Sequence, residues 1–116
     1  MANEPDRLFA VVARVAIPDH PAFQLRKGEI GLSVFELAAV EPPISEDELL
    51  ESFRSESIVV YRTIERVVAL GLLIAEIEGT ETLSERLRDA HREIVPNPTM
   101  TRTQFKAAHK LLENQW

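Results

Sequence analysis

The sequence contains no cysteine, few aromatic residues and no long apolar run, and each absence excludes a class of protein. Without cysteine, neither a disulfide framework nor a thiolate metal site can form. Aromatic residues make up 6% of the chain and are not interleaved with basic patches, so a base-stacking nucleic-acid surface is not expected. The apolar runs are much shorter than a membrane span requires. The polar start MANEPDR lacks the basic-then-apolar order of a signal peptide, so we expect a cytoplasmic protein without a membrane partner.

The common cofactor and catalytic motifs are also missing. There is no G-x-G-x-x-G for a Rossmann domain, no phosphate-binding P-loop and no H-E-x-x-H zinc motif. The stretch GLSVF lacks the second glycine of a hydrolase nucleophile elbow. The three histidines, His20, His91 and His109, lack metal-ligand spacing, so no metal site is predicted.

Charge is distributed unevenly along the chain. The formal net charge of -6 argues against nonspecific nucleic-acid binding, because a duplex carries dense negative charge. Residues 84–116 nevertheless hold six Lys or Arg and four Asp or Glu, which makes them net +2 against -8 for the rest. An acidic front with a mildly basic rear suits a small anionic ligand.

The remaining composition predicts one α+β domain spanning residues 1–116. Apolar residues make up 45% and charged residues 28% of the 116 residues, as in an ordinary globular domain. A capping box at Ser45 and Glu48 marks a helix start within 41–53. Residues 72–77 either begin a strand or extend the preceding helix. Strands are predicted at 8–17, 26–37, 72–81 and 91–95, helices at 41–53, 57–72 and 101–114, and a short helix or loop at 82–90.

The stretch RLRDAHREIVPNPTMTRTQF, residues 86–105, combines several chemically useful side chains. His91 and Glu93 alternate with Arg92, so a strand here places the histidine and the glutamate on one face. Pro96 then ends the strand, which leaves the pair near an edge that a ligand can reach.

Two motifs together resemble a known family. GLSVF at residues 31–35 and the block at 86–105, with Gly79–Thr80 between them, are similar to small type VI secretion effectors that have an ADP-ribosyltransferase-like fold. The resemblance implies a compact two-sheet domain with flanking helices that binds NAD as a substrate without a Rossmann motif. It also implies a bacterial toxin that transfers ADP-ribose to an unknown acceptor, is delivered to another cell's cytoplasm and is neutralised by an antitoxin or immunity protein.

The family pattern assigns roles to particular residues. It implies Ser33, His91 and Glu93 as catalytic residues. A carboxylate beside the ribose stabilises the positive charge that develops when the nicotinamide bond breaks, as in glycoside hydrolysis. The planar fork of an arginine suits the pyrophosphate, for which Arg88 and Arg92 are further candidates. The NAD-binding residues expected from the resemblance are Ala10, Arg14, Ser33, Tyr61 and Arg102.

Ala10 departs from the family pattern, which has an arginine at that point of the first strand. Three alternatives account for it. Arg14, four residues on and on the same strand face, takes over the role; or the site is incomplete; or the arginine was deliberately changed so that a toxic protein could be produced.

The rival hypothesis is a non-enzymatic module of the antitoxin or immunity type that binds a partner protein through its acidic helices. In that case Glu93 is a surface partner of an arginine, and Tyr61 packs on a helix face. The two hypotheses differ in one structural feature, namely whether Ser33, His91 and Glu93 converge on one pocket with an arginine.

Overall fold

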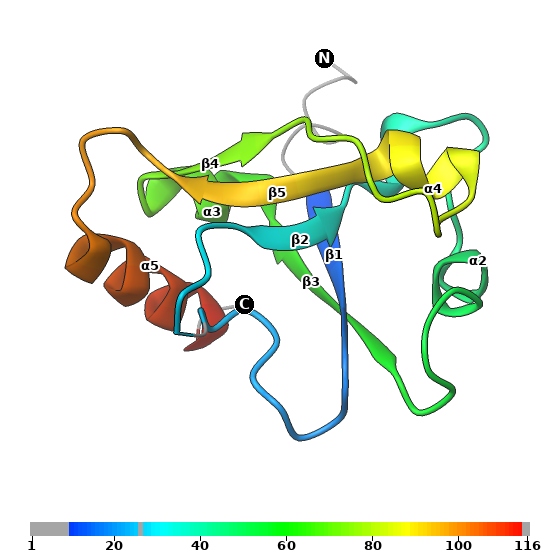
Figure 1. Ribbon diagram of the computed structural model, residues 1–116, viewed down its shortest axis with the longest axis horizontal. Coiled ribbons are helices and arrows are strands. Elements are labelled where there is room, and N and C mark those ends of the chain that lie inside the picture. Colours follow the sequence, from blue (N-terminus) through cyan, green and yellow to red (C-terminus); the bar gives the residue numbers. More distant parts are fainter. Residues whose placement is uncertain (1–9, 26, 115–116) are drawn as a thin grey trace, which may run out of the picture.

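The computed structural model describes residues 10–25 and 27–114 (Figure 1). Among these residues, no helix is long and apolar enough to cross a membrane. The elements in chain order are β1 (Val11–Ala16), β2 (Leu32–Phe35), a short 3-10 helix η1 (Leu37–Ala39), α2 (Glu46–Leu50), β3 (Ile58–Thr63), α3 (Ile64–Ala69), β4 (Leu72–Ala75), α4 (Glu85–Ala90), β5 (His91–Pro96) and α5 (Arg102–Asn114).

The strands form one five-stranded sheet in the order β3-β1-β2-β5-β4, and all neighbouring strands are antiparallel. This confirms the predicted α+β class. The two-sheet arrangement implied by the resemblance is not found in the described part of the chain, where one sheet has a narrow contact between β1 and β2. A single residue pair, Ala13 opposite Phe35, connects β1 to β2, whereas β1 pairs with β3 along its whole length. In Figure 1, β1 and β3 consequently cross the direction of β2, β5 and β4.

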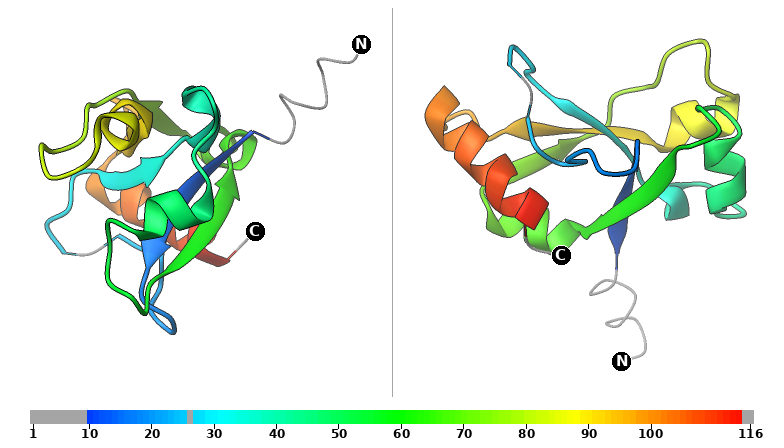
Figure 2. Two further views of the ribbon diagram at one scale, coloured as in Figure 1. Left: turned by 90° about the vertical axis from the view of Figure 1, so that its right-hand side faces the viewer. Right: turned by 90° about the horizontal axis from the view of Figure 1, so that it is seen from below.

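Two apolar clusters hold the sheet from opposite faces. The larger cluster packs α5 and α3 against the face that carries Leu32 and Ile94. The smaller cluster packs α2 and α4 against the face that carries Ala13 and Phe35. Figure 2 shows α5 at one end of the molecule and the α2–α4 pair at the other. Ser33 of β2, which lies on the same face as Phe35, remains exposed.

The predicted helix at 57–72 is wrong in its first half. Residues 58–63 form β3, and α3 begins only at Ile64. The segment has helical spacing, but its β-branched residues favour an extended chain, and pairing with β1 satisfies their backbone groups. Thr63 caps α3 by accepting from the N–H of Arg66, and Gly71, with φ of 85°, ends it as predicted.

The predicted start of α2 agrees with the structure, and the strand predicted at 72–81 agrees in part. Ser45 accepts a hydrogen bond from the N–H of Glu48 at 3.1 Å, so the predicted cap of α2 is confirmed. A full capping box would have the Glu48 carboxylate accept from the Ser45 N–H, but both of its oxygens accept from Arg86. The Glu48 carboxylate contacts Arg86 of α4 at 2.8 Å and ties the two helices together. The strand expected at 72–81 is shorter than predicted, because β4 ends at Ala75.

Buried polar groups anchor α5 to the loop that follows β1. The Arg62 guanidinium donates to the carbonyls of Leu112 and Glu113, each at 2.7 Å, and lies 4.7 Å from the centre of the Phe23 ring. The Nδ1–H of His109 donates to the Phe23 carbonyl at 2.8 Å, and the Glu113 carboxylate accepts from the Phe23 N–H. Both the backbone N–H and the carbonyl of Phe23, whose side chain is fully buried, are therefore bonded to side chains of α5.

His109 makes folding stability depend on pH. Burial is the largest cause that lowers the pKa of His109 below the usual ~6.5. Arg14 and Arg102 also lower it, and the bond to Phe23 and the charge of Glu29 partly oppose the shift. Because the unfolded chain binds a proton that the folded chain excludes, stability is full above about pH 6.5 and falls as the pH drops toward the lowered value.

We predict that His109→Asn, which keeps an amide donor for Phe23, reduces this pH dependence. The measurement is urea unfolding at a series of pH values from about 8 to about 5. His20→Asn, in an exposed loop, serves as the control and is expected to retain the wild-type slope. An unchanged slope in His109→Asn would contradict the assignment.

Candidate functional site

A pocket of about 290 Å³ opens where β1 and β2 separate. Arg14 and Val15 of β1, Ser33 and Phe35 of β2, and His91 of β5 line its strand side. Two loops close the rest, one through Ser52 and Phe53 and the other through Thr80, Thr82 and Leu83. Five separate segments of the chain therefore meet at this one point.

Ser33 and His91 are hydrogen-bonded inside the pocket. Phe35 lies opposite His91 in the β2–β5 ladder, so Ser33 is a diagonal neighbour of the histidine. Ser33 Oγ lies 3.2 Å from His91 Nε2, and His91 Nδ1 lies 2.6 Å from the carbonyl oxygen of Ile77. A carbonyl oxygen only accepts, so this network assigns the proton to Nδ1. In the neutral ring, Nε2 is then the acceptor and the Ser33 hydroxyl is the donor.

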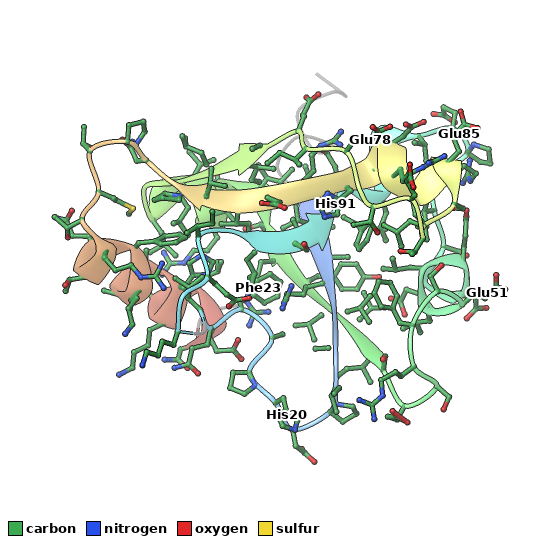
Figure 3. All side chains as sticks on the ribbon, in the orientation of Figure 1. His20, Phe23, Glu51, Glu78, Glu85 and His91 are labelled. Carbon is green, nitrogen blue, oxygen red and sulfur yellow. The ribbon has the colours of Figure 1, made fainter. Side chains whose placement is uncertain are left out.

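The surroundings hold the imidazole ring in place. His91 is buried, with 7% of its surface exposed, whereas Ser33 is exposed. The Phe35 ring packs edge-on against the imidazole with centres 5.5 Å apart. Figure 3 shows His91 between the β5 and β2 ribbons near the middle of the molecule. The histidine is fixed from three sides, and its reactive nitrogen faces a side chain that a ligand can reach.

Arg14 occupies the space between the separating strands. Its Nη1 donates to the Ser33 carbonyl at 2.8 Å, and its Nε donates to the Ala22 carbonyl at 2.5 Å. The bond to Ser33 therefore supplies one donor that the β1 backbone would otherwise provide to β2. The Arg14 side chain also brings a positive charge to the wall of the pocket.

Glu93 lies beside this pocket, outside the residues that line it. It faces Ser33 across the β2–β5 ladder, so the predicted common face of His91 and Glu93 is present. Arg92 points to the other face and contacts Glu36 at 3.2 Å. A Cβ on Gly31 would lie 2.7 Å from Glu93 Oε1, so a side chain there would displace the carboxylate.

The three other residues expected to bind NAD do not line the pocket. Ala10 precedes β1, where its carbonyl accepts from the N–H of Ile64 at 3.0 Å. Arg102, at the start of α5, donates to the Glu29 carbonyl. Tyr61 lies on β3, and its hydroxyl donates to Glu46. Burial first, and then this bond to Glu46, raise the pKa of Tyr61 to about 12.

Sequence reasoning missed several residues of the pocket. Phe35 and Thr80 belong to the GLSVF and Gly-Thr motifs, but neither had been assigned a role in the site. Phe53 and Leu83 come from loops in which no local pattern distinguishes them. In the described part of the chain, no group of three His, Asp or Glu side chains could hold a metal ion.

Comparisons with protein-family models, with curated proteins and with solved structures gave no match.

The close approach of Gly31 and Glu93 can be measured as an energetic coupling. In a double-mutant cycle of Gly31→Ala and Glu93→Ala, we predict that the added methyl group is less favourable when Glu93 is present, because the carboxylate must move. The expected coupling is about 0.5 kcal/mol or more in urea unfolding. In a control cycle, Gly31→Ala is combined with Glu65→Ala, which removes an exposed glutamate on α3. The two changes in unfolding free energy should then be additive. Additive effects in the Gly31–Glu93 cycle would show that the close approach makes no contribution to the free energy of unfolding.

Proposed function

We propose that the pocket binds NAD and that the protein transfers ADP-ribose from it to an acceptor. The observation that carries the proposal is the convergence of Ser33, His91 and Arg14, from three different strands, on one pocket. Glu93, the remaining residue of the convergence expected for an enzyme, lies beside the pocket without lining it. The resemblance to small secreted effectors of the ADP-ribosyltransferase type supports the same chemistry.

The size of the pocket suits part of the dinucleotide. Pockets for small ligands span ~300 to 1,000 Å³, and this one lies at the lower end, at about 290 Å³. It accommodates the nicotinamide and its ribose, while the rest of NAD extends over the surface. Phe35 and Phe53, with ring centres 6.2 Å apart, offer an aromatic wall to the nicotinamide. The charge of Arg14 attracts the phosphates.

In the proposed reaction, Glu93 stabilises the charge that develops when the bond to nicotinamide breaks. Ser33 and His91 are in position to bind ribose hydroxyls, and Glu93 stands across the ladder from Ser33. A ribose held there would have the carboxylate beside it. As the bond to nicotinamide breaks, positive charge builds on the sugar, and a fixed carboxylate stabilises that charge.

The acidic-helix module is less well supported. The first turn of α2 carries Glu46, Asp47 and Glu48. Glu46 accepts from Tyr61 and Glu48 pairs with Arg86, so two of these three carboxylates already bind groups of the same chain. A neutralising antitoxin or immunity protein, and delivery by type VI secretion into the cytoplasm of another bacterium, remain parts of the proposal that follow from the resemblance.

The test is calorimetric titration with NAD, followed by an assay of nicotinamide release. We expect Glu93→Gln to lower turnover by about 100-fold with little change in KM, because the charge acts mainly in the transition state. Glu65→Gln, with the same chemical change on α3, should behave as wild type. Absence of both binding and nicotinamide release in folded protein would refute the proposal.

A second variant tests whether Arg14 takes over the role that the family pattern gives to position 10. Ala10 lies at the opposite end of β1 from the pocket, and Arg14 lines the pocket. We therefore expect Ala10→Arg to leave NAD affinity and nicotinamide release close to the wild-type values, because the added side chain lies outside the pocket. A large gain of activity would instead show that an arginine is missing at position 10.

A further inference from the structure

The bond between Ser33 and His91 has the geometry of a nucleophile and its general base. Serine nucleophiles are activated by a base within hydrogen-bond reach that is itself oriented by a third group. Here the base nitrogen lies 3.2 Å from the hydroxyl, and the third group is the Ile77 carbonyl at 2.6 Å. We propose that Ser33 is an activated nucleophile that accepts acyl groups from small esters, with His91 as its base.

The orientation of the imidazole is set before any ligand enters. The Ile77 carbonyl accepts from Nδ1–H, which leaves the lone pair of Nε2 directed at Ser33 Oγ. The loop that carries Ile77 is tied back to α4 by a bond from the N–H of Gly79 to the Arg88 carbonyl at 3.4 Å. A backbone carbonyl thus does here what an aspartate does in the familiar triads: it holds one tautomer.

The pocket indicates the class of substrate. Its wall beside the serine is formed by the apolar side chains of Val15, Phe35, Phe53 and Leu83. That wall suits a short aliphatic acyl group, while the exposed position of Ser33 leaves the alcohol part of an ester in solvent. The positive charge of Arg14 lies in the same pocket, where it favours the negative charge that develops on the carbonyl oxygen.

The reaction balances without any further reagent. Ser33 Oγ attacks the carbonyl carbon of the ester while its proton passes to His91 Nε2. The adduct collapses, the bond to the alcohol oxygen breaks, and the same proton goes to the departing alkoxide. Water then attacks the acyl-serine and gives its proton to Nε2. The released Ser33 takes that proton back, which yields a carboxylic acid and an alcohol.

A second serine provides an internal control. Ser52 lines the same pocket and is exposed, as Ser33 is, but His91, the one histidine among the described lining residues, is hydrogen-bonded to Ser33. Simple access to the pocket would make both serines react alike. Activation by His91 would make Ser33 react alone. This activity does not depend on NAD, so it stands or falls separately from the proposed ADP-ribosyl transfer.

The experiment treats the full chain with a fluorophosphonate probe and locates the label by peptide mass spectrometry. A general base contributes ~10² to 10⁴-fold, so Ser33 should be labelled at least about 100-fold faster than Ser52. Ser33→Ala should abolish the fast label and Ser52→Ala should not. His91→Asn, which keeps an amide donor for the Ile77 carbonyl, should slow labelling by about 100-fold with its circular dichroism spectrum unchanged. The rate of p-nitrophenyl acetate hydrolysis should rank the variants as labelling does: wild type and Ser52→Ala fastest, His91→Asn slower, and Ser33→Ala slowest.

Equal labelling of the two serines, or no labelling of Ser33 in the wild type, would overturn the proposal. Labelling of Ser33 that persists at the wild-type rate in folded His91→Asn would also overturn it. If His91→Asn does not fold, the comparison of Ser33 with Ser52 within the wild-type chain decides by itself, because it needs no variant.

Discussion

The junction between β1 and β2 is the constraint on which the rest of this structure depends. Only Ala13 and Phe35 pair across it, and beyond that point the strands separate. The Ser33 carbonyl then has no backbone donor from β1. Arg14 supplies the donor from its side chain and spans the gap. The same separation creates the pocket, so the sheet distortion and the site have a single origin.

The far side of the molecule supports this junction through α5. Arg62 binds the last carbonyls of α5 and stacks on Phe23. Phe23 is adjacent to Ala22, whose carbonyl accepts the second bond from Arg14. Contacts therefore run without interruption from the end of α5 to the arginine in the pocket wall. A change that loosens α5 has a physical route by which it reaches Ser33.

The two proposed chemistries use the same pair of side chains in different ways. In ADP-ribosyl transfer, Ser33 and His91 bind the sugar and Glu93 supplies the charge. In acyl transfer, Ser33 itself reacts, His91 moves the proton and Glu93 has no part. Glu93 stands next to the pocket without lining it. The effect of removing the Glu93 charge on the reaction rate therefore distinguishes the two chemistries.

Local signals were sufficient for the cap at Ser45, for β5 with His91 and Glu93 on one face, for α5 and for the α+β class. They failed at residues 58–63, where helical spacing and β-branched composition disagreed and pairing with β1 decided the outcome. The site required tertiary structure, because the register between β2 and β5 brings Ser33 to His91 across 58 positions of sequence. The point at which β1 separates from β2 determined that Arg14 lines the pocket and Ala10 does not. Periodicity reports which face a residue takes on its own strand, but it does not report which strand lies beside it.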